Sequence, residues 1–246
     1  MDRQLLSAIA HRDHPIAAPI SESNLDRLLR RAALPDRARI LDLGCGEGEW
    51  SLRALELAPT AVADGVDISP HAVAAAERAA ARRNLSGRMS LHTMPAADFS
   101  AAEPYDLVLC VGSTHAFGDL KQTMEALGRF VRPGGLALVG EAFWERPPAP
   151  EIVEAIGQYP DLAGTVETAE SDGWLTVYAH VSEPAEWDEY EWSWTGTLTR
   201  WAAATTGPDA AQALAAAREH RDLWLNGYRN TLGFVSLLLQ RTGPAA

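Results

Sequence analysis

Short apolar runs alternate with segments of helical periodicity over the first 144 residues. Continuous or alternating apolar residues predict five strands, at 39–43, 61–67, 88–94, 105–112 and 136–144. Apolar spacing and cap residues predict four helices before or between them, at 21–34, 49–57, 70–83 and 119–131. Strands that alternate with helices at this spacing predict an α/β fold, in which a mostly parallel sheet has helices on both faces.

The pattern changes after residue 145. Segments 174–181 and 231–241 predict two more strands, which makes seven, and the residues between them read as helices rich in tryptophan. We interpret these residues as a helical cap inserted between the last two strands. The expected organisation is an N-terminal lid with helices (1–36), a core (37–182), the cap (183–230) and a last strand with its tail (231–246).

Composition narrows the range of partners. The chain has 246 residues, of which 47% are hydrophobic and 22% charged, as is typical of globular domains. A formal net charge of -12 and a sequence pI of about 5.0 make nucleic acid a poor partner. No stretch reaches the roughly 18 to 20 apolar residues of a membrane span. The N-terminus lacks the pattern of a signal peptide, so we expect a cytoplasmic protein with no membrane contact.

The two cysteines are far apart in the chain. Cys45 and Cys110 lie in apolar contexts and form neither a disulfide framework nor a metal-binding pattern. We therefore expect reduced, packed thiols and no bound metal. A homodimer is left open by the sequence.

Glycine recurs at every second position in the loop after the first predicted strand. In open α/β sheets, ligands bind at this end of the strands. A dinucleotide site needs the spacing G-x-G-x-x-G, but Glu49 stands where the third glycine would be and Gly48 comes one residue early. The acids Asp42, Glu47 and Glu49 disfavour a pyrophosphate and tolerate a cationic ligand with an ammonium or sulfonium group. The spacing favours the second kind of ligand.

Five motifs in order resemble those of the class I S-adenosylmethionine-dependent methyltransferases. They are "LDLGCGEGEW", "VADGVDISP", "PAADF", "YDLVLCVGSTHAFG" and "LGRFVRPGGLALVG", which together cover about residues 38–141. The resemblance implies a Rossmann-like fold and a bacterial stand-alone enzyme that methylates a small molecule. The expected cofactor is S-adenosyl-L-methionine.

The resemblance also implies a role for individual residues. Gly44 and Gly46 would let the methionine part of the cofactor approach the backbone, and Asp42 would lie near its ammonium group. Asp67 would accept both ribose hydroxyls, with a helix cap as its alternative role. The full set of cofactor-binding residues that we predict is Asp42, Gly44, Cys45, Gly46, Asp67, Ile68, Ala97, Asp98, Phe99 and Cys110.

The third motif would hold the adenine ring. Asp98 would accept from the adenine amino group, and Ala97 or Phe99 would make a backbone contact. Ile68 and Phe99 would sandwich the ring. The alternatives are that Asp98 is a turn residue and that Ile68 and Phe99 are ordinary core residues.

Catalytic residues are expected beyond the fourth and fifth predicted strands. A sulfonium methyl is already an electrophile, so positioning of the acceptor can supply much of the acceleration, and a base is optional. His115 has a side chain whose unperturbed pKa suits a base near neutral pH. Glu141 is the second catalytic candidate. Their alternative roles are a loop histidine held by backbone groups, and a carboxylate that only bonds His115 or shapes the pocket.

Substrate contacts are expected from the N-terminal segment and from the cap. His11 and His14 lie in a segment that folds over the cofactor in many members of the family, although a solvated tail is equally compatible with them. Trp187, Tyr190, Trp194 and Trp201 share one helical face, which either packs the cap on the core or forms an aromatic wall for an apolar or cationic acceptor. The acids of the cap, Glu183, Glu186, Asp188, Glu189 and Glu191, argue against an anionic macromolecule. The predicted substrate residues are His14, Trp144, Trp187, Tyr190 and Trp194.

Three other functions remain open at this point. A non-catalytic S-adenosylmethionine-binding module would retain the same glycines and Asp67. An NAD(P)-dependent oxidoreductase would share the loop. This sequence, however, lacks the third glycine at the required spacing, and it lacks a Tyr-x-x-x-Lys pair. A protein or RNA methyltransferase would need a docking surface, and no N-P-P-Y-type motif follows the fourth predicted strand.

Overall fold

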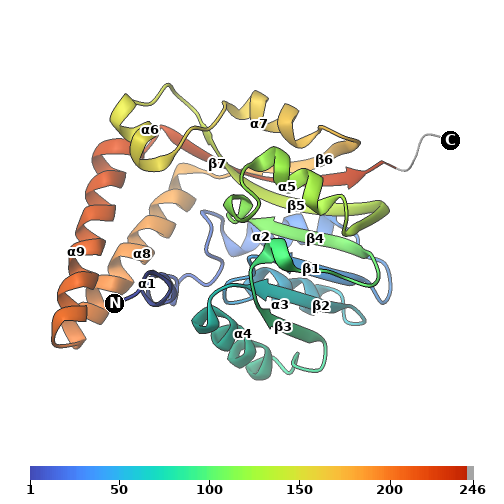
Figure 1. Ribbon diagram of the computed structural model, residues 1–246, viewed down its shortest axis with the longest axis horizontal. Helices are drawn as coiled ribbons and strands as arrows, with labels where there is room; N and C mark the ends of the chain where they lie inside the picture. Colours follow the sequence, from blue (N-terminus) through green and yellow to red (C-terminus); the bar gives the residue numbers. More distant parts are fainter. Residues whose placement is uncertain (243–246) are drawn as a thin grey trace.

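The computed structural model describes residues 1–242, and these form one seven-stranded sheet with helices on both faces (Figure 1). The strands lie in the order β3-β2-β1-β4-β5-β7-β6. Neighbours from β3 to β5 pair in parallel, whereas β7 is antiparallel to both β5 and β6. The strands are β1 (Arg39–Leu43), β2 (Val62–Asp67), β3 (Met89–Thr93), β4 (Tyr105–Val111), β5 (Val131–Trp144), β6 (Trp174–Val181) and β7 (Leu232–Arg241). The predicted fold class is confirmed, and the last four residues of the predicted tail lie outside the described part of the chain.

Two apolar layers cover the sheet. On one face, α2 (Glu22–Arg31), α3 (Glu49–Leu57) and α4 (Pro70–Arg82) contribute buried leucines and alanines to one core cluster. On the other face, α5 (Leu120–Leu127) and α7 (Leu162–Ala169) pack into a second cluster. Serine or aspartate side chains accept a hydrogen bond from the backbone at the start of α2, α4, α5 and α7, which satisfies otherwise free amides there.

The fifth strand is longer than predicted. The sequence pattern places a helix up to residue 131 and a turn at "RPGG", but α5 ends at Leu127 and β5 already begins at Val131. Val131 pairs with Tyr105, and the register between β4 and β5 then shifts before regular pairing resumes at Leu136. The Pro-Gly stretch is therefore an irregularity inside the strand, with Gly134 at φ +75°, and not a turn before it.

The cap lies between β6 and β7 in the chain, as predicted. It consists of α8 (Pro184–Ala204), α9 (Pro208–Leu223) and a π-helical turn (Trp224–Tyr228). The N-terminal helix α1 (Arg3–Ala10) packs with α8 and α9 through a separate apolar cluster that includes Ile9 and Leu198. In Figure 1 these three helices stand together beyond the end of the sheet toward which the parallel strands point.

Helices α6 (Pro150–Ile156) and α7 were not predicted from the sequence. None of the seven residues of α6 is fully buried, and Ile152, Val153 and Ile156 are only partly buried against the cluster that contains Trp144, so its apolar face is short. Pro150 opens the helix and Gly157 follows its end. Among residues 1–242, no helix combines the length and the apolar character needed to cross a membrane.

Candidate functional site

A cavity of about 660 Å³ lies at the carboxyl ends of the parallel strands and is covered by α1 and α8. Loops that follow β1, β2, β3 and β4 supply one side of it, and residues of α1 and α8 supply the other. From the loops and the start of α4 come Gly44, Gly46, Glu47, Asp67, Ile68, Ser69, Ala72, Pro95, Ala96, Val111, Gly112, Ser113, His115 and Ala116. From α1, the segment after it and α8 come Arg3, Gln4, Ser7, Ala8, His11, Ala17 and Tyr190.

Two glycines of the first loop serve different purposes. Gly44 has φ +78°, and a side chain there would meet the Cβ of Ser113 at 2.4 Å, so packing of two loops requires glycine. Gly46 has φ +53°, and nothing lies within 4 Å of the place where its Cβ would be. Because Gly46 also lines the cavity, its bare backbone forms part of a cradle for a ligand.

Asp67 is held rigidly at the end of β2. Its Oδ2 accepts from the Gly46 amide at 2.8 Å, and its Oδ1 accepts from the Ser69 amide at 2.8 Å. The N-cap of α4 is Ser69, whose hydroxyl accepts from the Ala72 amide at 3.3 Å, so Asp67 does not serve as the helix cap. Each carboxylate oxygen keeps further acceptor capacity for a ligand in the cavity.

The acids around the glycine loop do not act together as the sequence suggested. Asp42 is buried and accepts from the Ser51 hydroxyl at 2.8 Å, and burial raises its pKa to about 7. Glu49 is also buried and is bound by two arginines. Of the three acids, Glu47 alone is among the residues that line the cavity. The negative charge that faces a ligand at this loop is therefore smaller than the sequence suggested.

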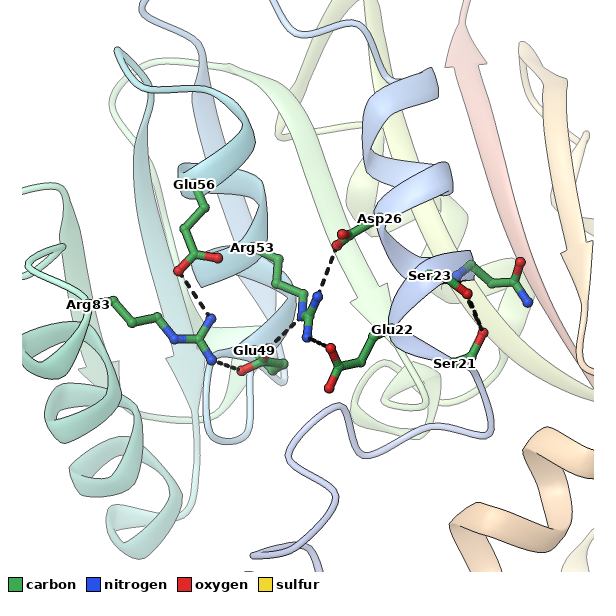
Figure 2. A network of polar contacts seen from close by, with 9 residues as sticks. Ser21, Glu22, Ser23, Asp26, Glu49, Arg53, Glu56 and Arg83 are labelled. Atoms are coloured by element: carbon green, nitrogen blue, oxygen red, sulfur yellow. Dashed lines mark hydrogen bonds and ion pairs between the residues drawn. The ribbon is translucent and has the colours of Figure 1, made fainter.

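Figure 2 shows how Glu49 is neutralised. Arg53 Nε lies 2.6 Å from Glu49 Oε1, and the same guanidinium reaches Glu22 at 2.6 Å and Asp26 at 3.1 Å on α2. Arg83, just after α4, binds the other oxygen of Glu49. This cluster joins α2, α3 and the end of α4 directly behind the glycine loop.

The two cysteines pack beneath the cavity and do not line it. Both are buried and free. Cys110 Sγ lies 3.3 Å from the Ser113 hydroxyl, which donates to the Leu43 carbonyl at 2.7 Å, and burial raises the pKa of Cys110 to about 12. The predicted free, packed thiols are present, but the geometry gives Cys45 and Cys110 no direct position on a ligand.

The third motif reaches the cavity one residue earlier than predicted. Pro95 and Ala96 line the cavity, whereas Ala97 and Asp98 are exposed on a 3-10 turn (Ala96–Asp98). The Phe99 ring packs on His92 and Phe130, with centroids 5.3 and 6.0 Å away, and is not among the residues that line the cavity. The geometry therefore does not place Phe99 on a ligand.

Ile68 behaves differently from Phe99. It is 58% exposed and lines the cavity directly after Asp67. Exposure of a large apolar side chain at this place is what an apolar ligand surface would require, and a plain core residue would be covered.

The two catalytic candidates lie at different depths. His115 is exposed and lines the cavity from a 3-10 turn (Thr114–Ala116) after β4. Glu141 is buried in β5, accepts from the Ala142 amide at 2.8 Å and has a pKa that burial raises. Trp144 is buried against Tyr159 and the π-helical turn, so it cannot line the cavity as predicted.

The aromatic face of the cap is divided between packing and the cavity. Trp194 stacks on His220 at 4.0 Å between α8 and α9, and Trp187 packs edge-on against Tyr228. Neither tryptophan lines the cavity, so the geometry supports the packing alternative for both. Tyr190 does line it, and its contact with the substrate stays a prediction.

Two acids of the cap are buried and hydrogen-bonded within the fold. Glu186 is buried and accepts from the Ser21 amide and from Asn24 Nδ2, both at 2.7 Å. Glu191 is buried and accepts from the Tyr228 hydroxyl at 2.6 Å, with His220 Nε2 at 2.7 Å from its second oxygen. The sequence-based use of these carboxylates as a repulsive surface is therefore wrong for Glu186 and Glu191.

The N-terminal helix supplies four cavity residues that the sequence did not indicate, Arg3, Gln4, Ser7 and Ala8. They recur at helical spacing with His11, which the sequence did indicate, while Ile9 and Ala10 are buried against the cap. The alternation of polar and apolar positions at 3–11 could have indicated this helix. His14 packs edge-on against Tyr190 at 5.6 Å and is not among the lining residues, so His11 takes the place predicted for His14.

Comparisons with known proteins agree with this arrangement. A family model described as a methyltransferase domain matches residues 40–135. Over 221 residues the chain is 32% identical to the uncharacterized protein YjhP of Escherichia coli (strain K12), which covers 86% of this chain and 87% of that protein. The X-ray structure of E. coli YjhP matches with a TM-score of 0.87 at 28% identity, over 96% of this chain and 99% of that one.

Two further proteins are similar to this chain. A methyltransferase from Thiobacillus denitrificans, solved with S-adenosyl-L-homocysteine, matches with a TM-score of 0.88 at 25% identity, over 98% of this chain and 99% of that one. Trans-aconitate 2-methyltransferase of Streptomyces avermitilis (strain ATCC 31267 / DSM 46492 / JCM 5070 / NBRC 14893 / NCIMB 12804 / NRRL 8165 / MA-4680) is 37% identical over 107 residues, which are 43% of this chain and 37% of that protein.

Proposed function

The chain belongs to the S-adenosylmethionine-dependent methyltransferases, and from this premise we propose that it methylates a small molecule in the cavity beneath α1 and α8. The observation that carries the proposal is the pairing of a fixed Asp67 carboxylate with open glycine backbone in one covered cavity. The similarity to methyltransferases, one of them solved with S-adenosyl-L-homocysteine, favours an enzyme of this family over a nicotinamide dinucleotide enzyme and over a binding module without activity.

The residues on the strand side fit the methyl donor. When bound, S-adenosylmethionine supplies a methyl group on a sulfonium, which is already an electrophile. We propose that Asp67 accepts the two ribose hydroxyls and that the backbone at Gly44 and Gly46 contacts the methionine part. Ile68 and Ala96 offer apolar contacts for the adenine. Gly112, at φ +66° and with no atom within 4 Å of its Cβ position, leaves room above β4.

A covered cavity favours a small acceptor over a macromolecule. Residues from α1 and α8 close the side of the cavity opposite the strand loops. A protein substrate or a nucleic acid would have to displace these helices to reach the cavity. The net charge of -12 also disfavours RNA. The name of the S. avermitilis relative, trans-aconitate 2-methyltransferase, indicates a small-molecule acceptor for that protein.

We further propose that His115 contacts the acceptor and that Glu141 supports its loop from below. His115 lines the cavity, and Glu141 lies buried in the neighbouring strand. The domain boundaries, a cytoplasmic location and a homodimer stay predictions from the sequence.

Titration calorimetry tests the donor. We expect saturable binding of S-adenosylhomocysteine and no binding of NAD⁺. Tight NAD⁺ binding without any response to S-adenosylhomocysteine would refute the proposed function.

Incubation with methyl-labelled S-adenosylmethionine tests the acceptor class. The protein is supplied in parallel with the small-molecule filtrate, the RNA and the protein fraction of a bacterial lysate. We expect label to enter the filtrate, and label that enters only RNA or protein would contradict a small-molecule acceptor.

A further inference from the structure

Tyr190 of α8 and His11, just after α1, meet at the side of the cavity that faces the strand loops. The Tyr190 hydroxyl lies 3.1 Å from His11 Nε2, and both residues line the cavity. The two residues are 179 positions apart in the chain. Only the packing of α1 on the cap brings them together.

The backbone fixes which nitrogen of His11 carries a proton. His11 Nδ1 lies 2.9 Å from the Ser7 carbonyl oxygen, which can only accept, and 3.3 Å from the Ser7 hydroxyl, which can accept or donate. The shorter contact assigns the hydrogen to Nδ1, which leaves a lone pair on Nε2 in the neutral ring. That lone pair can accept the proton of the Tyr190 hydroxyl.

The direction of this hydrogen bond decides what Tyr190 offers to a ligand. Because its own hydrogen points to His11, the tyrosine oxygen presents lone pairs to groups that approach from the cavity. It can therefore bind a hydroxyl or an N–H of an acceptor, and it cannot donate to a carboxylate without breaking its bond to His11.

We propose that Tyr190 and His11 form the proton acceptor for methyl transfer, and that the acceptor molecule is a neutral alcohol, phenol or amine. This proposal rests on the proposed function. Tyr190 Oη receives the proton from the acceptor's O–H or N–H as its own proton moves to His11 Nε2. The freed electron pair of the acceptor forms the bond to the methyl carbon, and the electrons of the broken sulfur–carbon bond remain on sulfur.

Charge is conserved within the site during this step. One positive charge leaves the sulfonium, and one appears on the His11 imidazolium, whose two N–H groups then donate to the Ser7 carbonyl and to Tyr190. Tyr190 is a catalytic residue in this scheme because it touches the acceptor. His11 acts through Tyr190 and is a positioning residue that also stores the proton.

The surroundings keep both groups neutral before the transfer. Burial lowers the pKa of His11 more than the hydrogen bond to the Ser7 carbonyl raises it, and the neighbouring His14 lowers it further. Burial together with Glu191 raises the pKa of Tyr190. His220 also disfavours charge on His11, whereas Glu191 on α8 favours it. Arg3, Glu47 and His115 are further ionisable groups along the same cavity.

His115 is less suited to this task than His11. Its ring makes no hydrogen bond to any group within residues 1–242, so nothing there fixes which nitrogen carries the proton. An exposed ring without such a partner can contact the acceptor, but its orientation is not set in advance.

Histidine ring NMR on the full chain loaded with S-adenosylhomocysteine gives a test that needs no acceptor. At pH 7 we expect the His11 ring to be neutral, with hydrogen on Nδ1 and a hydrogen-bonded lone pair on Nε2. His11→Gln assigns the signal. Tyr190→Phe should leave the hydrogen on Nδ1 and shift the Nε2 resonance to that of an unbonded lone pair. Hydrogen on Nε2, or a doubly protonated ring at pH 7, would overturn the proposal.

Single-turnover kinetics with the acceptor identified by methyl labelling gives the second test. Tyr190→Phe should slow methyl transfer by roughly 10²- to 10⁴-fold while the Kd of S-adenosylhomocysteine changes less than about two-fold. Tyr159→Phe, at a tyrosine that packs on Trp144 outside the cavity, is the matched control and should react at the wild-type rate.

The pH profile separates proton transfer from a structural effect. The wild-type rate should fall as pH drops through the lowered pKa of His11. In His11→Gln this decrease of the rate at low pH should disappear. Fast turnover in Tyr190→Phe, or an acceptor that has no O–H or N–H to lose, would overturn the proposal. Wild-type protein that fails to bind S-adenosylhomocysteine would instead refute the proposed function, so the two failures can be told apart.

Discussion

The two sides of the cavity are built in different ways. The side assigned to the cofactor consists of loops that each directly follow a parallel strand, so its residues are ordered by the sheet. The side assigned to the acceptor consists of one face of α1 and one tyrosine of α8, which come from opposite ends of the chain. A glycine motif can therefore indicate the donor, whereas the acceptor depends on how a cap is packed over it.

A buried carboxylate supports each side. Glu49 holds the cofactor side, where Arg53 and Arg83 connect it to α2 and to the end of α4 (Figure 2). Glu186 holds the acceptor side. It accepts from the Ser21 amide at the start of α2, and its second oxygen lies 2.8 Å from His180 Nε2 on β6. Each side can thus be weakened separately.

The largest expected effect is on cofactor binding at Asp67. Asp67→Ala removes the proposed acceptor for the two ribose hydroxyls and leaves the Gly46 and Ser69 amides without their acceptor, so the Kd of S-adenosylhomocysteine should rise by roughly 10²- to 10³-fold. Asp98→Ala is the matched control, because Asp98 is exposed and does not line the cavity, and its Kd should change little. Equal losses in calorimetry of the two variants would show that the third motif had been placed wrongly.

The next largest effect concerns the support of the cofactor side. Arg53→Ala leaves the buried Glu49 with one arginine in place of two, and the free energy of unfolding should fall by about 2 to 4 kcal/mol. The control is Arg27→Ala, an exposed change on α2 that should stay within about 0.5 kcal/mol. Urea unfolding measures both. A loss below about 1 kcal/mol in Arg53→Ala would mean that the cluster in Figure 2 behaves like an ordinary surface ion pair.

The smallest effect is a pH dependence on the acceptor side. Burial alone would raise the pKa of Glu186, but hydrogen bonds from Asn24, Glu183, Ser21 and His180 outweigh it and lower the pKa to about 2. A lowered pKa adds stability above the ordinary pKa of about 4.3, and this stability is lost as pH falls toward 2. Glu186→Gln should therefore be less stable than wild type by about 1 to 3 kcal/mol at pH 7.

That difference should shrink as the pH is lowered from about 5 to about 2. Urea unfolding at several pH values follows it, and Glu189→Gln, at an exposed acid of the same helix, should show no such trend. A constant difference between wild type and Glu186→Gln at all pH values would contradict a charged, hydrogen-bonded Glu186.

Four of the ten residues predicted to bind the cofactor line the cavity. Gly44, Gly46, Asp67 and Ile68 line the cavity because each follows a strand whose apolar run is easily read. Phe99 does not line the cavity because a 3-10 turn changes the direction of side chains within two residues, which motif spacing does not encode. Glu49 was misread because its partner Arg83 comes from a different helix.

The acceptor side was much harder to predict. Trp194 and Tyr190 share one helical face, yet the first stacks on His220 and the second reaches the cavity, because α9 covers only part of α8. Helical periodicity identifies a face but not the neighbour that covers it. The pairing of Tyr190 with His11 follows from tertiary packing alone.

A crystal structure with S-adenosylhomocysteine is the most direct test of the claim that the two sides face each other across one cavity. We expect the ribose hydroxyls to lie about 3 Å from the Asp67 carboxylate and the sulfur to face Tyr190 and His11. A ribose away from Asp67, or a sulfur directed toward Ile68 and away from α1 and α8, would contradict it.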